Sequence, residues 1–246
     1  MHVYKTKRTI EMSQDLTLKK IATIHTDFPG KFGLPRQSGL ANTTGRIVFE
    51  PEYRNPEALR GIENYSHLWL LWGFSMVHQD SWHATVRPPK LGGNQRVGVF
   101  ATRSPFRPNP IGLSCVELIS IEETPTDGRV LLVSGIDMMD GTPIYDIKPY
   151  LPYVDAKPEA KGSFSDLHKN DRLQVVFQTN PETGRSLEDQ VPTRKQDVLR
   201  QILSQDPRPS YQEDPNRIYG LDFAGMRIKF FVDHGVLTVC QVTPLS

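Results

Sequence analysis

The sequence of 246 residues has little cysteine and no long apolar run. Its two cysteines, Cys115 and Cys240, form neither a disulfide framework nor a metal-ligand pattern, so we expect buried free thiols and no metal site in a cytoplasmic protein. No stretch of about eighteen apolar residues occurs, which excludes a membrane-spanning helix and a membrane partner. Residues 1–15 are polar and lack the apolar centre of a secretory signal, so we expect a flexible N-terminal extension.

Two common catalytic patterns are also missing from the sequence. No G-x-G-x-x-G follows a predicted strand, which excludes the usual dinucleotide-binding fingerprint. No serine or cysteine has the local signature of an activated nucleophile. Histidines occur, but none lies in a pattern that assigns it acid–base work, so no histidine is predicted to be catalytic.

Acidic residues are absent from positions 81–116, although the net charge of the whole chain is only +1. The cations of this segment are interleaved with proline, glycine and aromatic residues. This composition favours binding of an anionic ligand, and a solvated charged surface is the alternative. The cations are Arg87, Lys90, Arg96, Arg103 and Arg107.

Short segments rich in valine and isoleucine, each bounded by turn residues, predict a strand-rich fold. One helix is predicted over 55–67, with Asn55 as its N-cap and Pro56 at its first position. Strands and helices do not alternate repeatedly, which argues against a parallel doubly wound sheet. We therefore expect a mainly β protein built as a barrel or a sandwich. The predicted strands are 16–26, 45–50, 67–76, 97–102, 115–122 and 129–137.

A change of composition divides the chain into two predicted domains. Residues 157–170 are polar and contain proline, glycine, serine and lysine, which is typical of a linker. We expect the strand-rich domain to occupy residues 16–156. Residues 171–246 then form a small α+β domain.

The second domain shows three regular patterns. Residues 172–180 predict a strand, and 227–242 predict a hairpin around Asp233-His234-Gly235. The apolar spacing in 193–205 is that of an amphipathic helix.

The stretch FATRSPFRPNPIGLS holds two arginines on a backbone that three prolines stiffen. A rigid backbone loses less entropy when a ligand orders its side chains, and a guanidinium donates two parallel bonds to a carboxylate or phosphate. We interpret Arg103 and Arg107 as a fork for an anion. The alternative is that the prolines shape a barrel rim and the arginines pair with surface acids.

A second dense stretch, MMDGTPIYDIKPYLPY, follows the predicted strand 129–137. Asp140-Gly141 predicts a hairpin turn. Asp137 and Lys148 would then lie near a barrel mouth, where a carboxylate could pair with a rim arginine or face a cationic ligand. The acids do not have the spacing of a calcium loop.

These stretches resemble a known family. VRPPKLGGNQRVGVFATRSPFRPNPIGLS and DGTPIYDIKPYLPY are similar to the two signature blocks of the TsaA-like (TrmO) family, and GLPRQSGL and SHLWLLW match its earlier blocks in order. The resemblance covers residues 18–155, and SQDPRPSYQ resembles the C-terminal part of the bacterial member.

The resemblance implies a fold and an activity. The fold is an antiparallel β-barrel, and the protein is a homodimer with the cofactor near the subunit interface. The activity is methyl transfer from S-adenosylmethionine to the N6 amine of threonylcarbamoyladenosine, next to the anticodon of tRNA. Residues 171–246 are then a candidate tRNA-binding unit. The alternatives are a non-catalytic protein that binds S-adenosylmethionine or RNA, and methyl transfer to another acceptor.

The resemblance also implies site residues. A proton acceptor for the amine is Asn109, Asp137 or a main-chain carbonyl. Family members commonly have histidine where this chain has Ser75, so only the backbone of Ser75 and Met76 is assigned to the pocket. The cofactor residues are Arg36, Gln37, Ser75, Met76, Arg103, Leu113, Ser134, Gly135, Ile136, Asp137, Asp140, Gly141 and Thr142. The tRNA residues are Arg87, Arg103, Arg107 and Lys148.

Overall fold

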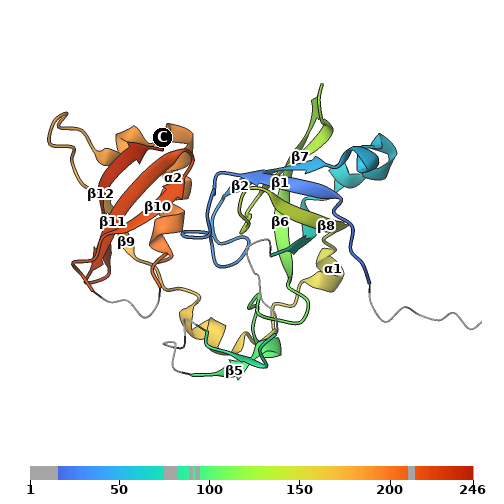
Figure 1. The fold of residues 1–246 in the computed structure, drawn as a ribbon, viewed down its shortest axis with the longest axis horizontal. Helices are drawn as coiled ribbons and strands as arrows, with labels where there is room; N and C mark the ends of the chain where they lie inside the picture. Colours follow the sequence, from blue (N-terminus) through green and yellow to red (C-terminus); the bar gives the residue numbers. More distant parts are fainter. Residues whose placement is uncertain (1–15, 75–81, 89–90, 92–94, 210–213, 246) are drawn as a thin grey trace, which may run out of the picture.

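The computed structural model describes residues 16–74, 82–88, 91, 95–209 and 214–245. Six of its strands close into an antiparallel barrel in the order β1-β2-β7-β6-β3-β8, which confirms the predicted mainly β fold (Figure 1). The predicted extension 1–15 lies outside the described residues. The strands are β1 (Ala22–Thr26), β2 (Thr44–Phe49), β3 (His67–Gly73), β6 (Ile111–Thr124), β7 (Gly128–Ser134) and β8 (Thr142–Pro149).

Alternation along each strand fills the interior of the barrel. On β3, Leu68, Leu70 and Trp72 are buried, because successive side chains of a strand point to opposite faces. Burial of each such side chain contributes about 1.5–3 kcal/mol to folding. Because the sequence of β3 is apolar almost throughout, the geometry of the strand in the barrel, and not a hydrophobic period, determines which face lines the core.

Strand β8 is not predicted from the sequence. Pro143 and Pro149, which cannot donate to a sheet ladder, lie near its two ends and disguise it as a loop. The predicted Asp140-Gly141 hairpin is also wrong. These residues form a turn, but β7 and β8 are not neighbours, since β7 pairs with β2 and β6, and β8 with β1 and β3.

The predicted helix over 55–67 also needs correction. The segment 55–67 contains two short 3-10 helices, η2 (Pro56–Leu59) and η3 (Ile62–Asn64), instead of one helix. Gly61 between them has φ +87°, a left-handed conformation that interrupts the helix. The predicted N-cap is confirmed, because the Asn55 side chain accepts a hydrogen bond from the Glu57 amide at 3.0 Å.

Two of the predicted strands extend beyond the residues that pair in a sheet, because apolar residues continue past the paired segment. The segment 16–26 forms β1 only from Ala22, and 97–102 contains only the two-residue strand β5 (Val97–Gly98). The 3-10 helix η5 (Val99–Ala101) follows β5 directly. Strand β5 pairs with β4 (Thr85–Val86) outside the barrel.

A four-stranded sheet forms the C-terminal part of the molecule, in the order β10-β11-β12-β9. The predicted hairpin is present, and the predicted amphipathic helix is α2 (Thr193–Ser204), which lies between this sheet and the barrel (Figure 1). The predicted linker contains the 3-10 helix η6 (Ser163–His168). The strands are β9 (Gln174–Phe177), β10 (Tyr219–Phe223), β11 (Met226–Asp233) and β12 (Val236–Pro244).

The barrel and the C-terminal sheet share one buried apolar cluster. Phe28, just after β1, packs against Phe223 of β10 with ring centroids 5.1 Å apart. Nearby, Lys195 of α2 forms an ion pair with Asp27. The sheet therefore supports the long loop after β1 from one side. Within the described ranges, no helix is long and apolar enough to cross a membrane.

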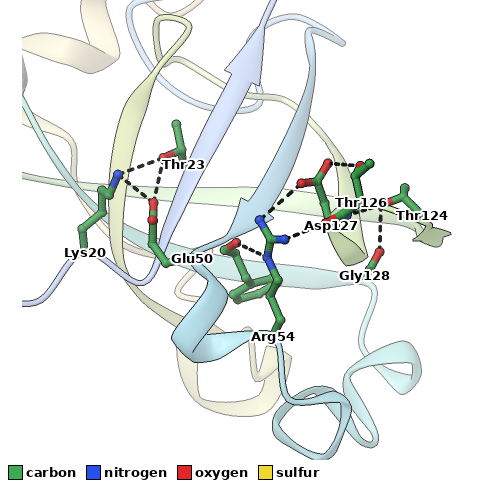
Figure 2. A network of polar contacts seen from close by, with 9 residues as sticks. Lys20, Thr23, Glu50, Arg54, Thr124, Thr126, Asp127 and Gly128 are labelled. Atoms are coloured by element: carbon green, nitrogen blue, oxygen red, sulfur yellow. Dashed lines mark hydrogen bonds and ion pairs between the residues drawn. The ribbon is translucent and has the colours of Figure 1, made fainter.

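The barrel end that carries residues 50–66 and 125–127, here called the far end, is closed by a polar network (Figure 2). Lys20 forms an ion pair with Glu50 at 2.6 Å. Arg54 donates to the carbonyl oxygens of Phe49 at 2.9 Å and Thr126 at 2.8 Å, and to the Asp127 carboxylate at 3.2 Å.

Candidate functional site

The barrel topology brings three connections to one end, here called the site end. They are residues 27–43, 74–110 and 135–141, which follow β1, β3 and β7. The strand register shows that residues flanking these connections are paired with one another. Thr44 pairs with Ser134, Gly73 with Ile111, and Ile24 with Thr142. Almost all residues predicted for the cofactor and for catalysis lie in or beside these connections.

The first and third connections are joined by main-chain hydrogen bonds. The Gly39 amide donates to the Gly135 carbonyl at 2.9 Å, and the Gly135 amide donates to the Thr43 carbonyl at 2.8 Å. Gly135 has φ +81°, and a Cβ there would lie 3.2 Å from the Gly39 nitrogen, so glycine is needed. The Thr43 hydroxyl donates to the Ile136 carbonyl at 2.6 Å. The backbone of the predicted cofactor segment 134–142 is thereby held in place.

The turn at Asp140 is bound to β1. Its carboxylate accepts a hydrogen bond from the Thr26 amide at 3.0 Å and lies 3.2 Å from Nδ1 of His25. The Gly141 amide donates to the Ile24 carbonyl at 2.9 Å, and Thr142 is buried. These residues hold the turn against the barrel, and their contact with a cofactor stays a prediction.

Asp137 lies in a chain of side-chain hydrogen bonds that starts in the barrel interior. Trp72 Nε1 donates to Ser114 Oγ at 2.9 Å, and the Ser114 hydroxyl donates to Asp137 Oδ1 at 2.6 Å. Ser114 is fully buried, so the chain fixes one carboxylate oxygen of Asp137 from the inside. A carboxylate fixed in this way is positioned to accept a proton at its other lone pairs.

Burial raises the pKa of the Asp137 carboxyl above its ordinary range. Hydrogen bonds from Ser114 and from the main chain of Asp137 and Ser38, together with the positive charge of Arg103, lower the pKa and oppose this effect. The net shift is upward, so this carboxylate binds a proton more readily than an exposed aspartate. A raised carboxylate pKa is what general-base catalysis requires.

The two polar side chains of the motif PRQ, Arg36 and Gln37, contact different parts of the molecule. Gln37 accepts a hydrogen bond through Oε1 from the guanidinium of Arg103, so the first and second connections touch here. Arg36 instead donates to the carbonyl oxygens of Asp206 at 3.2 Å and Arg208 at 3.4 Å, in the segment after α2. The structure therefore brings Gln37 and Arg103 together and directs Arg36 toward the C-terminal part.

Arg107 is enclosed by carbonyl oxygens of its own loop. Its Nε donates to Ser104 at 2.8 Å, and its Nη2 donates to Val99 at 3.3 Å and to Thr102. In this arrangement the guanidinium holds the proline loop in shape. It differs from the predicted fork, in which Arg103 and Arg107 would face one ligand together, and a direct contact of Arg107 with substrate stays a prediction.

Several predicted residues lie apart from this cluster. Lys148 forms an ion pair with Asp146 at 2.9 Å. It is six residues beyond Thr142 along β8, which corresponds to roughly 20 Å along the strand. Arg87, directly after β4, and the side chain of Asn109 are exposed. The predicted residues Ser75 and Met76 lie outside the described residues.

Leu113 lies on the outer face of β6, and 54% of its surface is exposed. Its neighbour Ser114 faces the interior, as strand alternation requires. Leu113 therefore borders the site from outside the barrel, and its contact with a cofactor stays a prediction.

Sequence reasoning missed the residues that support Asp137. Alternation along β6 could have placed Ser114 on the inner face, but no local pattern links it to Asp137, which is far away in the sequence. Among the described residues, no group of three His, Cys, Asp or Glu side chains is arranged to hold a metal ion.

Comparison with known proteins agrees with this architecture. Residues 23–156 match the tRNA-methyltransferase O N-terminal domain, and residues 170–245 match the TrmO C-terminal domain. The chain is 37% identical to the Escherichia coli (strain K12) tRNA (adenine(37)-N6)-methyltransferase over 92% of this chain and 97% of that protein.

A curated relative and a solved structure, both from Pseudomonas aeruginosa, are also similar. A putative S-adenosylmethionine-dependent methyltransferase, RcsF, is 40% identical over 83% of this chain and 87% of its own length. The crystal structure of TrmO from Pseudomonas aeruginosa is 30% identical, covers 94% of this chain and 100% of its own chain, and superposes with a TM-score of 0.73. Both domain matches and the extent of these identities show that the chain belongs to the tRNA-methyltransferase O family.

Proposed function

We propose that this protein is an S-adenosylmethionine-dependent methyltransferase that methylates N6 of adenine 37 in tRNA. The observation that carries the proposal is the site end of the barrel, where Asp137, Arg103 and Gln37 converge in a chain that is 37% identical to an enzyme named for this reaction. The cytoplasm, where tRNA is modified, is the proposed location.

The residues at the site end fit S-adenosylmethionine, which carries a positive sulfonium and a carboxylate. The half-buried Asp137 carboxylate suits the positive sulfonium, and the Arg103 guanidinium lies close enough to affect the pKa of that carboxyl. Main-chain groups of residues 134–142 are held in place beside them. The proposed cofactor residues are Arg36, Gln37, Arg103, Leu113 and the segment 134–142.

When bound, S-adenosylmethionine would supply an electrophilic methyl group, and as its S–CH3 bond breaks it would leave as S-adenosylhomocysteine. The lone pair of the adenine N6 atom is delocalised, so removal of the N6 proton as the new N–C bond forms makes the nitrogen a better nucleophile. We assign this proton to the Asp137 carboxylate, whose raised pKa and fixed orientation favour its acceptance. Asn109 is the alternative acceptor. It lies in the same proline loop, but its exposed side chain has no comparable support.

The acceptor adenosine is proposed to carry a threonylcarbamoyl group, whose carboxylate Arg103 would bind. Arg107 would contribute by holding the loop, through the three carbonyl contacts described above. An adenosine without this group would lack that charge-assisted contact, which is worth about 1.5–3 kcal/mol. This explains a preference for the modified base.

A homodimer with the cofactor near the subunit interface is also proposed. The exposure of Leu113 on the outer face of β6, beside the site, supports a second subunit that covers it. Sedimentation at several protein concentrations tests this proposal.

Nucleoside mass spectrometry tests the activity. The purified protein, S-adenosylmethionine and tRNA from a strain without this gene should yield methylated threonylcarbamoyladenosine. tRNA that lacks the threonylcarbamoyl group should react at least tenfold more slowly. Methylation of another nucleoside, or cofactor binding without any methylation, would contradict the proposal and support another acceptor or a non-catalytic protein.

A further inference from the structure

Two large aromatic rings form an exposed pair beside the basic loop. Trp82 is 48% exposed and Phe100 is 75% exposed. Their ring centroids are 6.2 Å apart and the ring planes differ by 26°, so the rings are stacked. Large apolar rings that are exposed side by side mark an interaction site, because the fold gains nothing from leaving them in water.

The short hairpin β4–β5 brings these rings together. Thr85 pairs with Gly98, and the Val99 amide donates to the Ala84 carbonyl at 3.0 Å. Trp82 precedes one strand and Phe100 follows the other, so both extend from the same end of the ladder. In Figure 1 the region around β5 projects from the barrel strands.

The backbone under Phe100 is fixed without the help of the ring. The Thr102 hydroxyl donates to the Val99 carbonyl at 2.8 Å, and Arg107 donates to the carbonyl oxygens of Val99 and Thr102. Val99 itself is buried. The ring is thus presented on a rigid turn, which lowers the entropy lost when a ligand stacks on it.

The charges around the pair select the kind of ligand. Arg96 reaches across the hairpin and donates to the Thr85 hydroxyl at 3.1 Å, Arg87 is exposed, and residues 81–116 contain no acid. A second copy of this chain docked symmetrically here would bring the same arginines toward each other, which is unfavourable. Exposed aromatic rings flanked by cations are instead the surface on which unpaired RNA bases stack.

We propose that Trp82 and Phe100 form a stacking platform for an unpaired base of the tRNA anticodon loop, and that Arg87 and Arg96 contact the adjoining phosphates. The inference rests on the proposed function, since it assigns a binding surface for the same tRNA. Arg107 acts here as a positioning residue, because it reaches the base only through the turn that carries Phe100.

The platform is tested with a short RNA hairpin of the anticodon-loop sequence and with whole tRNA. Phe100→Ala should weaken hairpin binding and raise KM for tRNA about tenfold, and Trp82→Ala with Phe100→Ala should do so further. In both variants kcat and the binding of S-adenosylmethionine should not change. Trp82→Phe, which keeps an aromatic ring, should retain most of the RNA affinity that Trp82→Ala loses. Tyr153→Ala, which removes a ring that is 84% exposed and outside the basic segment, is the matched control and should bind RNA normally.

Three outcomes separate the proposals. A wild-type protein that methylates no tRNA overturns the proposed function. A wild-type protein that methylates tRNA, together with a double variant of unchanged KM, overturns the platform alone. A double variant that sediments as a smaller species and loses cofactor binding shows that the rings join two copies of the chain, which also overturns the platform.

Discussion

The two ends of the barrel differ in the groups to which their cationic side chains bind. At the far end, cations meet carboxylates: Lys20 pairs with Glu50, and Arg54 with Asp127 (Figure 2). At the site end, Arg103 donates to the neutral amide oxygen of Gln37.

The other site-end arginines follow the same rule. Arg36 and Arg107 donate to main-chain carbonyl oxygens. A neutral acceptor orients a guanidinium but leaves its full charge available, whereas a carboxylate cancels it. Arg54 at the far end therefore serves stability, whereas Arg36, Arg103 and Arg107 at the site end keep their charge for an anionic ligand.

The largest effect is expected from Asp137→Asn. Loss of the proton acceptor should lower the rate of methyl transfer by about 10²–10⁴-fold. Because the pKa of Asp137 is raised in the folded protein, the wild-type rate should rise with pH through that pKa, and the variant should lose this dependence. Single-turnover rates across pH measure both effects.

Asp137→Asn should lower the rate of methyl transfer without lowering the stability of the fold. A pKa above the unfolded value means that the folded state binds the proton more tightly, so this carboxyl reduces wild-type stability as pH rises through the raised pKa. Asp137→Asn should therefore be at least as stable as the wild type at neutral pH. Asp127→Asn at the far end is the control, and it should lose stability but keep its methylation rate.

Arg103→Met should come next in size. It should reduce kcat/KM for tRNA methylation by about 10–100-fold, because a charge-assisted contact is worth about 1.5–3 kcal/mol. The melting temperature should change little, since the guanidinium is exposed and its described hydrogen bond goes to Gln37. A large loss of stability with normal kinetics would reverse the assignment of the two ends.

Arg54→Met should have the complementary phenotype. The half-buried guanidinium makes three contacts to residues of the far end, and its removal should cost about 2 kcal/mol of unfolding free energy. Denaturant unfolding measures this loss, and kcat per folded molecule should equal that of the wild type. Reduced kcat at full folding would show that the far end also serves the reaction.

The smallest effect concerns Glu50. Its hydrogen bond with Lys20 lowers its pKa below the ordinary range, so the ion pair stabilises the fold above the unfolded pKa and loses this contribution as pH falls through the lowered value. The pair is partly exposed and should contribute less than about 1 kcal/mol. Melting curves of wild type and Glu50→Gln should differ slightly at neutral pH and converge in acid.

Local patterns predicted much of the fold. Short segments rich in valine and isoleucine located β2 and β7, a continuous apolar run located β3, and helical spacing located α2. Prediction failed where a long-range contact overrides a local preference. β8 forms despite its prolines because β1 and β3 lie on either side of it.

The site was predicted in part. The signature stretches located Arg103, Gln37 and Asp137, but the partners of Arg36 and Arg107 were not predicted. Main-chain carbonyl oxygens leave no mark in the sequence, so a guanidinium that binds them cannot be told from one that binds a ligand.

By itself, the sequence determined the strand-rich fold, the stiff proline loop and the acid-free segment that surrounds it, because these follow from residue type and spacing alone. Only the tertiary structure decided that Trp72 and Ser114 support Asp137, that Arg107 braces its own loop, and that Trp82 stacks with Phe100. The contacts of Trp72, Ser114 and Asp137 depend on strand register and barrel closure, which join residues that are distant along the chain. The aromatic pair depends on the β4–β5 ladder, and the contacts of Arg107 depend on the folded shape of its loop.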